Sequence, residues 1–288
     1  MRAGYRSRVL RTIAIVAIVL WSLGPMMVGV VTSLSTQADV QHVPTRWLPA
    51  HPNTAAYRSF IEGKPPPGSN ASGAASDPSD FKHALFNSVT TTLIATLVIL
   101  VVSVLAGYGF SRLPFRGSRP IMWAIVGALL VPVFTIVVAL FRVMANLHLI
   151  DTRFGLVLVF AATQGPLAMW LAYNQCRELP PEPVEAALID GCNQWQAFIR
   201  VALPQMRSGI AAMGAIFMLA VWGEFLIPLL LAPTLKTKPV TVNITELVGK
   251  YATNYPVLAA AGVIALIPPA IVALVLNSQI RGVLGGSN

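Results

Sequence analysis

Charged residues are scarce in this sequence: Asp, Glu, Lys and Arg make up only 11% of its 288 residues. A soluble domain usually has about a quarter of its residues charged, so a soluble globular protein is excluded. Cysteine is nearly absent as well, since only Cys176 and Cys192 occur, which excludes a disulfide framework and a cysteine-rich metal cluster. The four histidines lack paired ligand spacing, and no metal site is expected.

Hydrophobic residues dominate instead, at 55% of the chain, and the mean hydropathy is +0.68. Six apolar runs are as long as the roughly 18 residues that a membrane-crossing helix needs. These runs are Ile13 to Val31, Val89 to Phe110, Ile121 to Phe141, Phe154 to Tyr173, Gly209 to Ala232 and Val257 to Leu276. The sequence therefore predicts an all-α membrane protein with six transmembrane helices.

The first run also has a feature of signal peptides, because arginines precede it. Its apolar part is longer than the usual signal core, however, and no small-x-small cleavage site follows closely. An uncleaved membrane anchor is the favoured interpretation.

The net charge of +9 and the pI of about 10.1 do not indicate nucleic-acid binding, because the basic residues are spread between the apolar runs. They fit the positive-inside rule for membrane proteins. A multi-pass protein of a bacterial-type cell membrane, surrounded by lipid, is expected, with tails 1–11 and 278–288 in the cytoplasm. The transmembrane domain between them, 12–277, has an external loop at 32–87 with a Pro-, Gly- and Ser-rich flexible insertion at 63–80, and a cytoplasmic loop at 178–206.

Prolines interrupt several of the predicted spans. A proline within a span frees a carbonyl group and permits a bend, which neighbouring helices or a water-filled cavity can accommodate. Such bends are common in transport proteins, although inert helical bundles have them too. The interrupting residues are Pro132, Pro166, Pro228 and the pair Pro268 and Pro269.

The cytoplasmic loop concentrates acids in a chain that otherwise has few of them: Glu178, Glu182, Glu185 and Asp190. Prolines and acids suit a helix start, and Gly191 suits a helix stop. Apolar residues then recur at the spacing of one helix face, at Trp195, Phe198, Ile199 and Ala202, before Pro204. The loop is predicted to form a helix, a glycine turn and a second helix. A hairpin lying on the bilayer would carry basic residues on its polar face, whereas the first helix here carries only acids, which favours a basic protein groove as its partner.

The same residues carry a specific resemblance. Glu185, Ala186 and Ala187, then Asp190 and Gly191, then Phe198 and Pro204 resemble the EAA loop of the permease subunits of ABC importers. The chain is closest in pattern to permeases of the maltose-importer type. Further segments with this resemblance are Asn87-Ser88, Ala106 to Arg112 with Phe115 to Gly117, Leu149 to Thr152 with Gly155-Leu156, Trp222 to Phe225, and Pro239 to Thr241. Gly223 stands where the family pattern has Asn.

The resemblance implies the fold of a type I ABC importer permease and a coupling role for the loop. The loop would dock into a cleft of a separate ATPase, and Gly191 would provide a turn too tight for a side chain. The chain has no phosphate-binding loop of the form G-x-x-x-x-G-K-[ST]. No enzyme activity and no cofactor are expected in this subunit; ATP and Mg would be bound by the partner ATPase. The implied partners are a second permease subunit in a heterodimer, two ATPase copies and an external solute-binding protein, but no nucleic acid.

The implied substrate is a sugar, either an oligosaccharide or a related polyol. Candidate pore or substrate contacts are Trp170, Tyr173, Trp222 and Glu224. Glu224 admits two interpretations, because an acid in a span is usually functional: a proton-coupling carboxylate, or a polar group near the outer end of the fifth span that a neighbouring helix stabilises. The first would suit a stand-alone ion-coupled carrier, but internal repeats and several intramembrane charges are missing. An intramembrane enzyme is disfavoured because no His or Asp lies inside a span.

Overall fold

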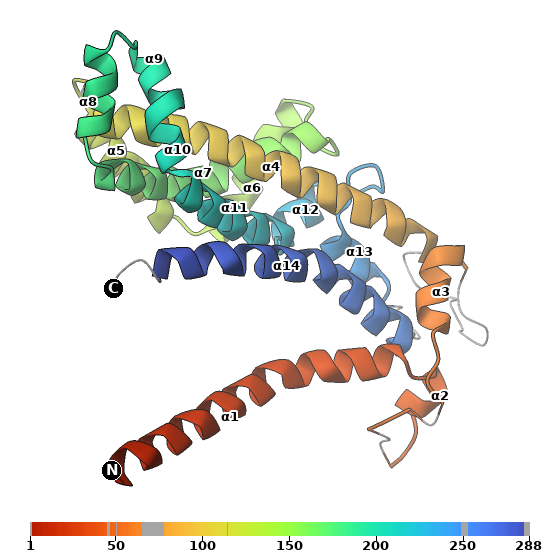
Figure 1. Cartoon of the computed structure of the whole chain (residues 1–288). Helices are drawn as coiled ribbons and strands as arrows, with labels where there is room; N and C mark the ends of the chain where they lie inside the picture. The colour runs from red at the N-terminus through yellow and green to blue at the C-terminus, as the bar shows by residue number, and fades with distance from the viewer. Residues whose placement is uncertain are drawn as a thin grey trace. The chain divides into compact units, whose positions relative to one another are not determined.

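The structure is a computed structural model, and it describes residues 2–44, 47–49, 51–64, 78–113, 115–248 and 253–284, with the side chains of 11–275 within those ranges. Every regular element in these ranges is a helix (Figure 1). The predicted all-helical class is confirmed. Most of the predicted flexible insertion lies outside the described residues.

The chain divides into two compact units. The first contains 1–83 and 243–267, and the second contains 84–242 and 268–288. The helices, in chain order, are α1 (Arg2–Ser33), α2 (Gln37–Val40), α3 (Ala55–Glu62), α4 (Pro78–Arg112), α5 (Ser118–Gly127), the 3₁₀ turn η1 (Ala128–Leu130), α6 (Val133–Asn146), α7 (Arg153–Glu178), α8 (Glu182–Ile189), α9 (Gln194–Ala197), the π-helical turn η2 (Phe198–Ala202), α10 (Leu203–Gln205), α11 (Arg207–Trp222), α12 (Leu226–Leu231), α13 (Val240–Glu246) and α14 (Tyr255–Leu284).

Within the described residues, four helical segments are long and apolar enough to cross a membrane, and up to six if each of two bent helix pairs is one span. The four are Arg11–Ser33, Pro78–Arg112, Arg153–Glu178 and Tyr255–Val275. None of the apolar window of α1 is buried within the chain, and Trp21 is 86% exposed. A bare apolar surface of this size needs lipid or another subunit to cover it.

The third predicted span is bent in the structure. α5 with η1 meets α6 at an angle of 103°. The bend lies at Val131 and Pro132, both with extended backbone, because proline cannot donate a helical hydrogen bond and restricts the residue before it. α7, in contrast, continues through Pro166.

The fifth predicted span, Gly209 to Ala232, is not one helix. α11 ends at Trp222, Gly223 to Phe225 are non-helical, and α12 follows. Apolar composition alone indicated a continuous span, but this break exposes polar backbone groups that need hydrogen-bond partners. Glu224 is one of the residues in the break and therefore lies outside any helix.

In the first unit, the segment after α1 is folded rather than wholly flexible. The hydroxyl groups of Ser33 and Tyr57 lie 2.7 Å apart, and the rings of Phe60 and Phe81 are 4.4 Å apart. The side chain of Gln37 accepts a hydrogen bond from the Tyr255 amide at 3.0 Å.

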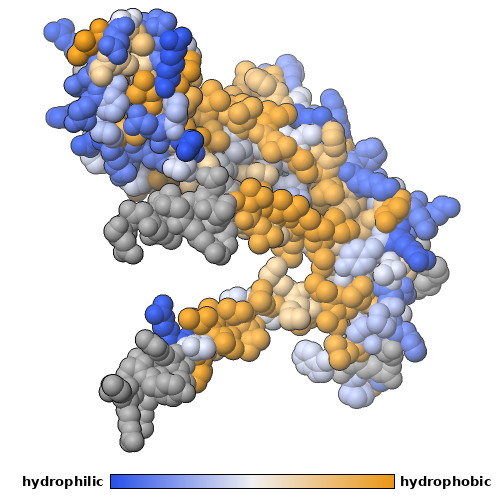
Figure 2. All heavy atoms as spheres, in the orientation of Figure 1, coloured by the Kyte–Doolittle hydropathy of each residue, from blue (hydrophilic) through white to orange (hydrophobic). Residues whose placement is uncertain are grey.

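In the second unit, α4 and α7 cross at very close range. A methyl group on Gly107 would lie 2.7 Å from the Cβ of Ala172 and 2.7 Å from the amide nitrogen of Tyr173. Small residues allow membrane helices to approach in this way. Elsewhere in this unit, Ile99, Leu156 and Phe217 are buried in the core. Figure 2 shows hydrophobic side chains along α4 and a hydrophilic surface over the α8–α9 end of this unit.

Candidate functional site

The acidic segment forms a helical hairpin of α8, a turn, and α9 continued by η2 and α10. Gly191 in the turn has a left-handed backbone, with φ of +90°. The Cys192 amide donates to the Ala187 carbonyl at 2.9 Å, and the Gly191 amide to the Leu188 carbonyl at 3.2 Å. This pair of bonds is a Schellman helix ending, which favours glycine at the left-handed position. Asn193 then caps α9, because its side chain accepts from the Gln196 amide at 2.8 Å.

The expectation that no side chain would fit at Gly191 is wrong. A Cβ built there meets nothing within 4 Å. Glycine is required by the backbone angle, because a left-handed conformation is strained for other residues by about 1–2 kcal/mol, and not by lack of space.

The residues predicted for coupling fall into two groups: exposed residues, which we call the outward set, and a buried residue that packs against the core. Glu185, Ala186, Asp190, Gly191 and Pro204 are exposed, Ala187 is half-buried, and Phe198 is buried.

Phe198 holds the hairpin to the helices below it. Its ring lies 4.7 Å from that of Tyr108 on α4 and 5.6 Å from that of Trp195. Phe198, Ala197, Ala202 and Val184 are all buried in the core of the unit. The outward set is thus presented on a base fixed by apolar packing.

Half of the predicted apolar face of the second helix is exposed. Phe198 and Ala202 are buried, but Trp195 is 58% and Ile199 41% exposed. The chain widens here into the π-helical turn η2, so residues at α-helical spacing do not stay on one face. Trp195 and Ile199 line an apolar groove of about 360 Å³ with residues of α4 such as Val101.

Arg112, the last residue of α4, ties that helix to the start of the hairpin. Its guanidinium donates to the Cys176 carbonyl at 2.9 and 3.2 Å, and also to the Leu179 carbonyl. Leu179 directly follows the last residue of α7 and lies three residues before α8. The sequence marked Arg112 only as part of a resembling segment, and gave no signal of which carbonyls it would bind.

At the opposite end of α4 and α7, several resembling segments contact one another. Asp151 accepts hydrogen bonds from the hydroxyl groups of Thr234 and Thr237, both at 2.6 Å. Arg153 donates to the Asn87 side-chain oxygen at 2.9 Å, and the Val240 amide donates to the Ser88 hydroxyl at 2.7 Å. Segments distant in the sequence therefore form one polar cluster, which we call the outer cluster.

Glu224 caps the short helix α12. Its carboxylate accepts from the Leu226 amide at 3.2 Å and the Ile227 amide at 3.5 Å. Its backbone carbonyl accepts from the Thr241 hydroxyl at 3.0 Å. Acids favour the amino end of a helix, where they satisfy free amides, so these contacts match a stabilising role.

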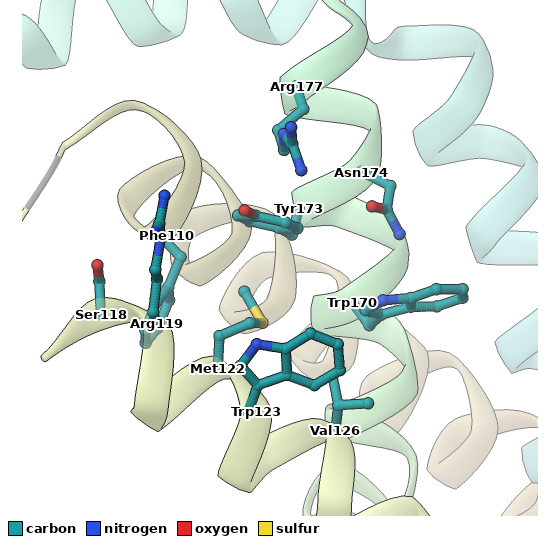
Figure 3. A pocket seen from close by; sticks show the side chains of 10 residues that line it. All are labelled: Phe110, Ser118, Arg119, Met122, Trp123, Val126, Trp170, Tyr173, Asn174 and Arg177. Atoms are coloured by element: carbon teal, nitrogen blue, oxygen red, sulfur yellow. The ribbon is translucent and has the colours of Figure 1, made fainter.

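The four candidate pore contacts do not come together. Trp170 and Tyr173 line a cavity of about 510 Å³ between α4, α5 and α7, and Figure 3 shows this cavity. Trp222 and Glu224 line a different, much smaller cavity of about 10 Å³ beside Thr91 and Pro228. The sequence could not separate these two places, since aromatic residues in different spans carry no sign of their neighbours.

Comparison with known proteins bears on this geometry. The family described as "Binding-protein-dependent transport system inner membrane component" matches residues 99–281. The chain belongs to this family. It is a permease subunit of an ABC importer, and the matched range includes the hairpin, the Arg112 contacts and most of the outer cluster.

Individual relatives agree with the family. The sulfoquinovosyl glycerol transport system permease protein of Agrobacterium fabrum is 27% identical over 278 residues, which cover 96% of this chain and 92% of that protein. The diacetylchitobiose uptake system permease protein of Streptomyces coelicolor is 34% identical over 68% of this chain and 66% of that protein. Among solved structures, a chain of a bacterial ABC transporter involved in the import of the acidic polysaccharide alginate has a TM-score of 0.80 at 20% identity, with 96% of this chain and 98% of that chain covered. The permease is accordingly a multi-pass membrane protein with the importer fold.

Proposed function

We propose that this permease forms half of the pore through which an ATP-driven importer carries an oligosaccharide or a related polyol. The relatives named above are named for sulfoquinovosyl glycerol and diacetylchitobiose, and a transporter of similar fold imports alginate. Sugar chemistry is common to all three. The second half of the pore is a different permease subunit.

The proposal that the hairpin couples the permease to an ATPase rests on the exposed tip of the hairpin. Glu185, Ala186 and Asp190 point outward on a hairpin whose base is buried. An acidic, rigidly based projection suits a cleft with basic residues on another protein. The hairpin docks there on a separate ATPase, which binds ATP and Mg, and two copies of that ATPase serve the two permeases. Ala187, Gly191 and Pro204 shape the docking segment, and Phe198 transmits its movement to α4.

The proposed orientation follows from the hairpin. An ATPase uses cytoplasmic ATP, so the hairpin and both termini lie in the cytoplasm, and the outer cluster lies on the far side, where a solute-binding protein delivers the sugar. Trp170, Tyr173, Trp222 and Glu224 belong to two separate cavities, so we propose them as two separate pairs of pore contacts.

A charge reversal tests the docking surface. Glu185→Arg, on the outward face of α8, should weaken binding of the ATPase to the permease and reduce ATP-driven uptake in proteoliposomes. Glu178→Arg is the matched control, because Glu178 is also an exposed acid but ends α7. If Glu185→Arg retained normal ATPase binding and uptake, the hairpin would not be the docking element. Uptake without ATP that stops with a proton uncoupler would contradict the importer assignment itself.

A further inference from the structure

The cavity between α4, α5 and α7 has a chemistry that coupling does not explain. Two guanidinium groups reach it from different helices, Arg119 from α5 and Arg177 from the last turn of α7 (Figure 3). Ser118 and Asn174 add polar groups to its wall. None of the ten residues that line it is acidic. A cavity with two permanent cations and no anion favours a ligand with negative charge.

Aromatic and apolar side chains form the rest of the wall. Trp123 is 73% exposed and Trp170 is 41% exposed, and Met122 and Val126 line the cavity beside them. Exposed tryptophans are typical of the boundary between lipid and water, where the ring contacts acyl chains and the indole N–H meets polar groups. A ligand that fits the whole cavity has an anionic part and an apolar part.

The cavity lies at the hairpin end of the second unit. Arg177 is one residue before the end of α7, and Arg112, whose guanidinium binds the carbonyls of Cys176 and Leu179, ends α4 beside it. In the proposed orientation, on which this inference depends, that end is the cytoplasmic boundary of the membrane. Basic pockets between membrane helices on this side bind the headgroups of anionic lipids.

We propose that this cavity binds the headgroup of an anionic phospholipid, with Arg119 and Arg177 on the phosphate. A volume of about 510 Å³ is in the range of small-ligand sites. A neutral sugar fits less well, because it has no negative charge to pair with the two guanidinium groups. The bound lipid joins the start of α5 to the end of α7, immediately before the hairpin.

The experiment measures lipid bound to the importer assembled with its partner subunits. Complexes are reconstituted in phosphatidylcholine nanodiscs with or without phosphatidylglycerol, extracted, and analysed for retained lipid by native mass spectrometry. The wild-type complex should retain phosphatidylglycerol in preference to phosphatidylcholine. Arg119→Gln and Arg177→Gln should each weaken retention on the order of five-fold, as expected for one basic residue near an anionic lipid. Arg207→Gln is the matched control, since Arg207 is exposed at the same end but does not line the cavity.

Other outcomes overturn the proposal. If the two Gln variants and the control retained equal amounts of phosphatidylglycerol, this would show that the cavity does not hold the lipid. If inorganic phosphate in detergent displaced phosphatidylglycerol at low concentration, the cavity would bind a free anion instead. Arg119→Lys and Arg177→Lys are the controls for misfolding, because they keep the positive charge. They should retain more phosphatidylglycerol than the Gln variants. If the Lys and Gln variants lost phosphatidylglycerol equally, the assignment would be contradicted. ATP-driven uptake by the same preparations tests the proposed transport function separately.

Discussion

The contacts of Arg112 predict a coupling defect of measurable size. Its guanidinium donates two hydrogen bonds to the Cys176 carbonyl and one to the Leu179 carbonyl. A hydrogen bond from a charged donor contributes about 1.5–3 kcal/mol. Arg112 is half-buried, so water can replace part of this interaction, and we take about 1 kcal/mol for each carbonyl. Arg112→Gln should therefore destabilise the attachment of the hairpin to α4 by about 2 kcal/mol, equivalent to roughly a 30-fold larger open fraction.

Hydrogen exchange measures that opening directly. Amides of α8 and of the η2 turn should exchange roughly 30-fold faster in Arg112→Gln if they exchange by local opening, while those of α6 should not change. ATP hydrolysis by the assembled importer should persist, with fewer sugar molecules imported per ATP. Arg116→Gln, at an exposed arginine in the following loop, is the control. Unchanged exchange in the hairpin together with a normal ratio of uptake to hydrolysis would refute the role of Arg112 as an attachment point.

Substitutions at Gly191, Glu224 and Gly107 have definite expected outcomes. Gly191→Val should reduce ATPase binding in a pull-down assay, because a β-branched residue is strained at φ of +90°, whereas Gly191→Asn should be nearly normal, since Asn tolerates left-handed angles. In Glu224→Gln the amide oxygen can still cap α12, so the variant should stay folded. Its uptake should remain ATP-dependent and insensitive to a proton uncoupler, because Glu224 stabilises the helix and does not couple protons. Glu224→Ala loses the cap and should destabilise the permease by about 1 kcal/mol in thermal unfolding. Gly107→Ala should lower the melting temperature because its methyl group would meet Ala172 at 2.7 Å, while Gly109→Ala, with nothing within 4 Å, should not.

The sequence predicted helices where long apolar runs occur, because burial in lipid requires about 20 apolar residues in helical form. Four of the six predicted spans lie within single helices, and the EAA segment is the predicted hairpin. The break at Gly223 to Phe225 was missed, because an apolar run gives no indication of where the backbone leaves the helix. The π-helical turn was missed for a similar reason: its apolar residues have ordinary α-helical spacing.

The site was predicted less completely than the fold. Motif resemblance identified Asn87, Asp151 and Thr241, but the partners that each of them contacts depend on how helices pack, which one-dimensional spacing does not encode. The sequence assigned no separate role to the cavity residues Arg119 and Arg177, which belong to the basic residues that fit the positive-inside rule. That rule predicts their side of the membrane, but not their convergence on one cavity, which depends on how α4, α5 and α7 pack.

The two functional ends of the second unit are joined by the same pair of helices. α7 has 26 residues, which at 1.5 Å per residue is about 39 Å, more than the roughly 30 Å of a bilayer's hydrocarbon core. Both α4 and α7 have a residue of the outer cluster near one end, Asn87 and Arg153, and the Arg112 contacts at the other. Gly107 packs so closely on Ala172 that even one added methyl group would clash, so the two helices are in tight contact at their crossing. In the proposed mechanism, a movement of the hairpin enters α4 through Phe198 and reaches the outer cluster through the packed pair of α4 and α7.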